Sequence, residues 1–157
     1  MELAAINVAK RILTLSALFN EEMTNLKLQK LLYYCQGWYL ALERKPFFTE
    51  QIEAWVHGPV VPVVFREYRA KKWNPIAIDS ADSLSGSAFG SQADSHIKEV
   101  LNAYRGLTGT QLEKMTHNED PWKIARGNTP IDMPSQAVVT HESMISYFRL
   151  RISKGRF

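Results

Sequence analysis

Apolar residues recur at helical spacing through the segment 26–44, and this periodicity predicts the central helix of the protein. The main apolar face and the stripe beside it consist of Leu28, Leu31, Leu32, Cys35, Trp38, Tyr39 and Leu42, and of Leu26, Tyr33 and Leu40. A helix that is apolar over most of its circumference is normally covered on several sides. Thr24 or Asn25 can cap its start, and Pro46 stops it. We therefore expect this helix to be the most buried element of a globular domain.

Weaker periodicity predicts further helices on both sides of this segment. They cover residues 3–19, 62–72, 95–105, 110–116, 120–127 and 141–153. Pro62 and Pro121 suit the first turn of a helix, where a missing N–H costs nothing. Asp94 can cap the helix that follows it, and Thr110 with Glu113 matches a capping box. These signals together predict a mainly α protein.

A short β-ribbon is expected directly after the central helix. Residues 47–49 and 51–56 are aromatic and β-branched, and residues 76–78 are a candidate third strand. Residues 79–95 are rich in serine and aspartate, which predicts a solvated, mobile loop. We expect a single compact helical domain over residues 1–157, with a small β-ribbon near residues 47–56.

Composition is ordinary for a soluble protein and leaves the function open. The 157 residues are 45% hydrophobic and 22% charged, with a net charge of +3. One cysteine excludes an internal disulfide, and its position on the apolar helix face predicts a small buried hydrophobe. Polar residues interrupt the first apolar run, and the central helix is too short to cross a membrane. We expect a cytoplasmic protein without membrane contact.

The sequence carries no recognisable catalytic or metal-binding pattern. His57, His96, His117 and His141 lack the spacing of metal ligands, and no nucleophile elbow, Walker loop or dinucleotide fingerprint is present. Glu119 and Asp120 are better explained as residues favoured by the dipole at a helix start than as an acid–base cluster with His117. We expect no enzyme activity, no cofactor and no metal.

Two basic segments are the remaining candidates for a binding surface. The first is the helix 62–72 with the tryptophan after it, and the second is the C-terminal end. They carry Arg66, Arg69, Lys71, Lys72 and Trp73, and Arg149, Arg151, Lys154 and Arg156. Such charges form either a solvated helix face or a site for an acidic protein surface or a phosphate backbone. The basic pattern alone does not choose between these.

Three motifs and a short C-terminal match give the chain a family resemblance. The motifs are KLQKLLYY at residues 27–34, AWVHGPVVP at residues 54–62 and THNEDPW at residues 116–122, with the match at residues 145–148. In this combination the chain resembles the Panacea domain, the SocA-like, phage-associated antitoxin family that includes GepA-like proteins of mobile elements. The resemblance runs over residues 26–148.

The resemblance implies a mainly helical antitoxin that neutralises a toxin encoded nearby by direct protein–protein binding. It leaves two alternatives open, a nucleic-acid-binding regulator of its own operon and a proteolytic adaptor that delivers the toxin to a ClpXP-type protease. No fused helix-turn-helix segment is seen, so DNA is the less favoured partner. The motif residues look structural, namely Lys27, Gln29, Lys30, Trp55, Gly58, Pro59, Pro62, His117, Glu119, Pro121 and Trp122. The expected toxin contacts are Arg66, Arg69, Lys72, Trp73, Arg149 and Arg151.

Overall fold

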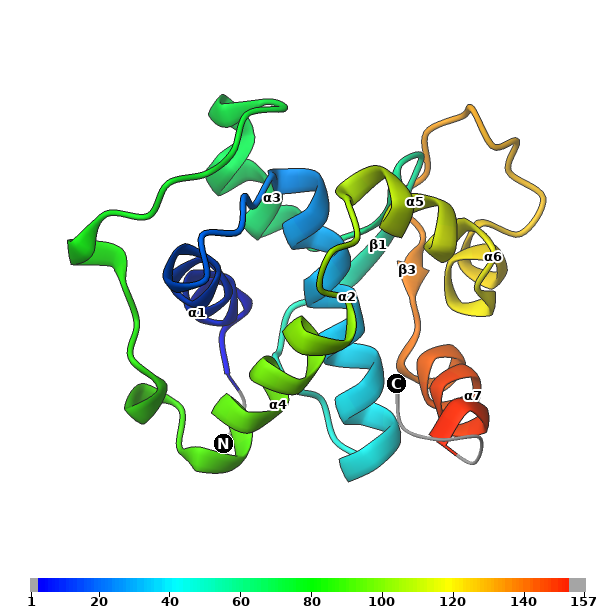
Figure 1. Ribbon diagram of the computed structural model, residues 1–157. Coiled ribbons are helices and arrows are strands. Elements are labelled where there is room, and N and C mark those ends of the chain that lie inside the picture. Colours follow the sequence, from blue (N-terminus) through cyan, green and yellow to red (C-terminus); the bar gives the residue numbers. More distant parts are fainter. Residues whose placement is uncertain (1–2, 153–157) are drawn as a thin grey trace.

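Helix α2 (Asn25–Glu43) is the centre of the computed structural model, which describes residues 3–152. Every residue from Lys27 to Ala41 is buried. Thr24 caps the helix by accepting a hydrogen bond from the Lys27 backbone N–H at 3.2 Å. Helices on several sides and one strand of the small sheet contact α2, as the surrounding ribbons in Figure 1 show. The expectation of a central, most buried helix is confirmed.

The remaining helices cover α2 and make the protein mainly α. They are α1 (Ala5–Leu18), α3 (Pro62–Tyr68), α4 (Ser91–Ala103), α5 (Gly109–His117), α6 (Asp120–Arg126) and α7 (His141–Ile152), with 3₁₀ turns η1 (Arg69–Lys71), η2 (Ser80–Asp82) and η3 (Gly86–Ala88). The capping box of α5 is formed by Thr108 and Gln111, so the predicted pair, Thr110 and Glu113, was wrong by two residues. Within residues 3–152 no helix combines the length and apolar character that a membrane crossing needs.

Aromatic side chains fill the space where α2, α4 and α7 meet. The Tyr34 ring stacks on Tyr104 with centroids 4.0 Å apart, and Trp38 lies 4.9 Å from Phe148. Gly37 lets α7 approach the α2 backbone directly, because a Cβ at this position would lie 2.1 Å from the Phe148 ring. The ring of Phe148 therefore occupies the space that a side chain at position 37 would need.

The small sheet has three antiparallel strands, and the hairpin differs from the predicted ribbon. β1 (Ile52–Trp55) pairs with β2 (Gly58–Val60) on one side and with β3 (Val138–Val139) on the other. Residues 47–49 were expected to pair with β1, and this was wrong. The side chain of Gln36 accepts the backbone N–H groups of Phe47 and Phe48 at 2.7 and 3.2 Å. Residues 47–49 also form a single bridge with Leu3, so their backbone groups are satisfied without pairing with β1.

Residues 76–78 do not form the predicted third strand. The Ile76 N–H donates to the Met23 carbonyl at 2.7 Å, and its side chain is buried. This bond fixes Ile76 to the loop before α2, and residues 77–78 pair with no strand. The third strand instead comes from residues 138–139, which the sequence presents as part of an irregular stretch.

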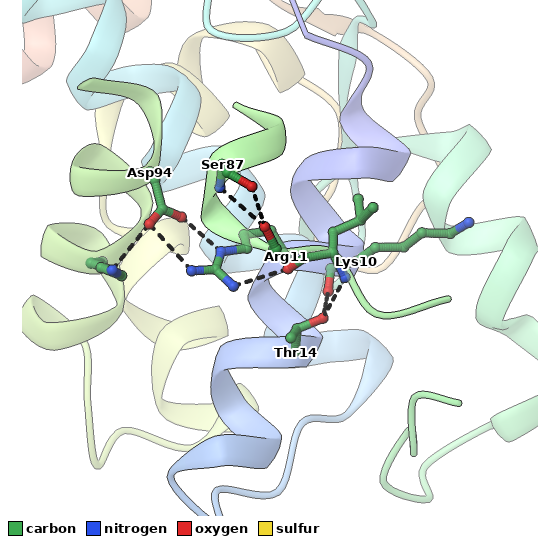
Figure 2. Close-up of polar contacts among 8 residues, drawn as sticks. Lys10, Arg11, Thr14, Ser87 and Asp94 are labelled. Atoms are coloured by element: carbon green, nitrogen blue, oxygen red, sulfur yellow. Dashed lines mark hydrogen bonds and ion pairs between the residues drawn. The ribbon is translucent and has the colours of Figure 1, made fainter. Parts of the chain in front are cut away.

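The segment 79–95 is shorter as a loop than expected, because α4 already begins at Ser91. Asp94 does not cap that helix. It lies inside α4 and accepts from Arg11 Nε at 2.7 Å, as Figure 2 shows, so that the pair ties α1 to α4. Arg11 also donates to the Leu84 carbonyl at 2.9 Å, and Thr14 accepts the Leu84 N–H at 3.1 Å. The loop is thus bound to α1 at its middle.

Candidate functional site

A groove of about 660 Å³ opens beside the first turns of α2. Its walls are the end of α3 with η1, the turn between β1 and β2, the start of α5, and the loop before β3. Most of its lining surface is apolar, and the apolar side chains there include Leu26, Trp55, Val60, Phe65 and Trp73. The volume falls in the range of sites that enclose a ligand or the side chains of a partner. This groove is the candidate functional site.

Gln29 fixes the first turns of α2 against the segment that leads into α3. Its side-chain carbonyl accepts the Val61 N–H at 2.9 Å, and its amide donates to Asn25 Oδ1 at 2.9 Å. Asn25 in turn donates to the Phe65 carbonyl at 3.1 Å. Pro62 takes the first position of α3, as its missing N–H favours. These polar groups are satisfied within the protein.

Lys30 crosses beneath the β1–β2 hairpin and is fully buried. Its Nζ donates to the carbonyl of Pro59 at 3.2 Å. Gly58 has φ = 105°, and a Cβ there would lie 2.6 Å from Lys30 Cε, so only glycine satisfies both the backbone angle and the contact. Burial lowers the pKa of Lys30 to about 7, partly offset by the negative charge of Glu113. Lys27, one turn earlier, is also buried.

Glu119 points into the protein and does not cap α6. Its two carboxylate oxygens accept hydrogen bonds from the hydroxyls of Tyr33 and Tyr34, each at 2.9 Å. Burial raises the pKa of Glu119 to about 7, although the tyrosine donors oppose that rise. The earlier interpretation of Glu119 as a dipole-favoured helix-start residue is therefore incomplete, because its side chain joins α6 to α2.

His117 and Trp122 hold α5 and α6 against the hairpin. Their rings stack with centroids 4.2 Å apart. His117 Nε2 lies 2.9 Å from the Val56 carbonyl oxygen, and the Trp122 indole donates to the Trp55 carbonyl at 2.8 Å. Burial lowers the pKa of His117. Pro121, buried in the first turn of α6, completes this contact.

Two exposed basic residues, Arg69 at the start of η1 and Lys72 directly after it, lie at one wall of the groove. Arg69 and Lys72 line it, together with Trp73, whose side chain is 81% exposed. Arg66 is also exposed but does not line the groove. Within residues 3–152 these four side chains make no hydrogen bond or ion pair. The structure thus brings three of the predicted toxin contacts together.

The other two predicted toxin contacts lie elsewhere. Arg149 and Arg151 are exposed on α7, which Figure 1 shows well separated from α3. The Arg151 guanidinium covers the ring of Tyr147 at 3.4 Å and donates to its carbonyl at 3.1 Å. Lys154 and Arg156 lie outside the described residues. Among the described residues, the basic side chains near α3 and those on α7 therefore lie on separate parts of the fold.

Arg126 and the loop after it were not singled out by the sequence. Arg126 is buried and donates to the carbonyls of Ala54, Pro130 and Met133 at 3.1, 2.7 and 2.6 Å. These bonds hold the loop whose residues 134–136 form a wall of the groove. A single arginine in a short helix gives no signal of this role. Among residues 3–152, no cluster of three or more His, Cys, Asp or Glu side chains is suited to a metal ion.

Comparison with known proteins identifies the class to which this framework belongs. The chain belongs to the family described as Antitoxin SocA-like, Panacea domain, whose profile matches residues 28–123. That range contains most of α2, the hairpin, α3, α4, α5 with His117, and the first turn of α6 with Trp122. It ends before the loop that closes the groove and before α7. The resemblance carried by the sequence motifs is confirmed.

Among individual proteins, the chain is similar to Antitoxin SocA of Caulobacter vibrioides (strain NA1000 / CB15N). The two are 32% identical over 126 residues, which cover 74% of this chain and 67% of the relative. No solved structure matches the chain.

Proposed function

We propose that this protein is an antitoxin that neutralises a cognate toxin by binding it directly through the groove. Membership of the antitoxin family supports the antitoxin role. The observation that carries the groove assignment is the exposed Trp73 beside Arg69 and Lys72 on its wall. Tryptophan and arginine are the residue types most enriched at energetically dominant positions of protein interfaces. A partner that covers them gains contact without disturbing the fold.

The proposal assigns the motif residues to the framework that shapes the groove. The Gln29 side chain accepts a hydrogen bond from the Val61 N–H, and Lys30 Nζ donates one to the Pro59 carbonyl. Both side chains are therefore bonded within the protein before a partner binds. Neutralisation then requires a folded antitoxin and a stoichiometric complex, and it involves no catalytic step by this chain.

Co-expression with the toxin gene encoded beside it tests the proposal. Reversing both charges on the groove wall, Arg69→Glu with Lys72→Glu, is expected to abolish growth rescue. The thermal midpoint should stay nearly unchanged, because exposed charges contribute only about 0–1 kcal/mol to folding. A matched variant, Arg149→Glu with Lys45→Glu, makes the same charge change at exposed positions outside the groove. It should rescue fully. If the groove variant still rescues growth, or if only the matched variant fails to rescue, the toxin does not bind at the groove.

The same cells separate direct binding from delivery to a ClpXP-type protease. Direct neutralisation predicts that the toxin accumulates with its antitoxin at undiminished level and elutes with it as one complex. A toxin level that falls when the antitoxin is present, and recovers in cells lacking the protease, would favour the adaptor. Regulation of the operon is less well supported, because α3 and α7, which carry exposed basic residues, lie apart in the fold (Figure 1), whereas a phosphate backbone is bound by basic side chains acting together.

A further inference from the structure

Resting on the proposed function, we infer that the toxin segment entering the groove is acidic and carries a large apolar side chain. The groove has two distinct chemical regions, an apolar floor and a cationic wall. The occupant must complement both of them. The inference concerns the chemistry of the toxin segment, which the family assignment leaves open.

The floor of the groove selects an apolar side chain. Trp55 and Phe65 meet edge to face there with ring centroids 5.0 Å apart, and Val60 and Leu26 lie beside them. The polar groups nearby, on Asn25 and Gln29, are already bonded to each other and to backbone atoms. A polar side chain entering this region would lose water without gaining a partner, whereas an apolar one gains contact.

The wall of the groove selects negative charge. Arg69 and Lys72 line it, and Glu113 is the one carboxylate among the described lining residues. That carboxylate lies 3.1 Å from His57 Nδ1, so a side chain of the protein is already within hydrogen-bond distance of it. Three exposed cations elsewhere lie within ion-pair distance of acids, namely Lys98 with Asp94, Arg105 with Glu21 and Lys123 with Asp120, and so does the half-buried Lys10 with Asp82. Within residues 3–152, Arg69 and Lys72 have no such partner.

Backbone strain at Lys72 is a second and independent sign that this wall serves binding. The Asn74 N–H donates to the Lys71 carbonyl at 3.0 Å, closing a turn in which Lys72 has φ = 54° and ψ = −119°. These angles belong to the second residue of a type II′ turn, a position that favours glycine. In this same chain a glycine, Gly127, adopts the same conformation with φ = 54° and ψ = −122°. The turn at Lys72 keeps a cation where the fold alone would favour glycine, and it presents Trp73 to solvent.

Two substitutions at Lys72 separate charge from strain. Lys72→Gly removes both the charge and the strain, so it should raise the thermal midpoint while weakening toxin binding. Lys72→Ala removes the charge alone, so it should weaken binding to the same degree without raising the midpoint. If neither substitution weakens binding of the purified toxin, Lys72 has no role in recognition and the inference fails.

The segment itself can be identified by photo-crosslinking. p-Benzoylphenylalanine replaces Trp73 in one variant and the exposed Leu150 on α7 in a matched variant, and each is co-expressed with the toxin. Mass spectrometry of the adduct at position 73 should identify a toxin segment with net negative charge and at least one large apolar residue. The Leu150 variant should give no adduct. A neutral or basic segment at position 73, or an adduct only at position 150, would overturn the inference.

A charge exchange completes the experiment. Replacing the acidic residues of the crosslinked segment by lysine should reduce affinity by on the order of tenfold or more, and Arg69→Glu with Lys72→Glu should recover most of it. If the wild-type proteins associate but the exchange recovers nothing, the antitoxin assignment stands and the proposed charge pairing falls. The proposed function itself fails if no toxin associates with the wild-type chain. It also fails if the wild-type chain binds duplex DNA and the Arg69→Glu, Lys72→Glu variant loses that binding.

Discussion

Replacing Lys30 by methionine should change the pH dependence of stability in a way that the buried amine alone explains. Burial lowers the pKa of Lys30 from 10.5 to about 7 in the folded protein. Between these two values the unfolded chain holds a proton that the folded protein releases, so stability rises with pH across the window. Below pH 7 the ammonium is buried, and the folded protein is less stable by up to about 5 kcal/mol than it would be with the neutral amine.

The methionine variant lacks this titration but loses one hydrogen bond. The Pro59 carbonyl, which accepts from Lys30 Nζ at 3.2 Å, would be left unsatisfied at a cost of about 1–3 kcal/mol. Lys30→Met should therefore be more stable than wild type by roughly 2–4 kcal/mol near pH 6. This advantage should shrink by about 3 kcal/mol as the pH approaches 9.5.

Urea unfolding followed by tryptophan fluorescence, at intervals between pH 6 and 9.5, measures the difference between the two proteins. Lys114→Met removes an exposed lysine from α5 and is the matched control, which should follow the wild-type profile. If the difference between wild type and Lys30→Met is constant across this range, the reasoning about the buried amine is wrong.

Three further predictions concern the framework around α2. Burial raises the pKa of Glu119 from 4.5 to about 7, so wild-type stability should fall by up to about 3 kcal/mol as the pH rises through that window, and Glu119→Gln should flatten the profile in urea unfolding. Gly37→Ala should cost about 1–3 kcal/mol, since the new Cβ would lie 2.1 Å from the Phe148 ring, and an unchanged thermal midpoint would contradict this. Trp38→Ala should cost about 3–5 kcal/mol in the same unfolding assay, because it removes a large side chain that is 2% exposed, and a loss below about 1 kcal/mol would show that the site is loosely packed.

The elements that could be predicted from the sequence are those whose own residues specify them. The apolar circumference of α2 required burial on several sides, and Thr24, Pro62 and Pro121 signalled the helix starts where they occur. Strand pairing was harder, because it depends on what else satisfies the backbone. Nothing near residues 47–48 in the sequence indicates that Gln36, a turn or more before the end of α2, accepts their N–H groups.

The groove could be predicted only in part, for a similar reason. Arg69, Lys72 and Trp73 stand out because they are basic and aromatic residues at the end of a short helix. In the groove these residues lie with Trp55 and the loop 134–136, and that loop is held by Arg126. Arg126 donates to the carbonyl of Ala54, which is distant in the chain, and to the carbonyls of Pro130 and Met133 in the loop that follows it. Arg149 and Arg151 are likewise basic residues near the end of a helix, but that helix, α7, lies apart from α3 in the fold (Figure 1).

The distribution of polar contacts explains how this framework can keep its shape while its binding surface changes. Polar side chains of α2 are bonded to three neighbouring segments. Gln29 and Lys30 bond to Val61 and Pro59 at the end of the hairpin, Gln36 bonds to Phe48, and Tyr33 with Tyr34 bond to Glu119. Replacing any of these leaves a buried partner unsatisfied, which typically costs about 1–3 kcal/mol, and only at Lys30 does relief from burying the ammonium outweigh that cost at low pH. The side chains of Arg69, Lys72 and Trp73 have no such bonds within residues 3–152, so the fold places little constraint on them. Different partner chemistry can therefore be accommodated by substitution at the groove wall alone, provided that the bonds made by α2 are retained.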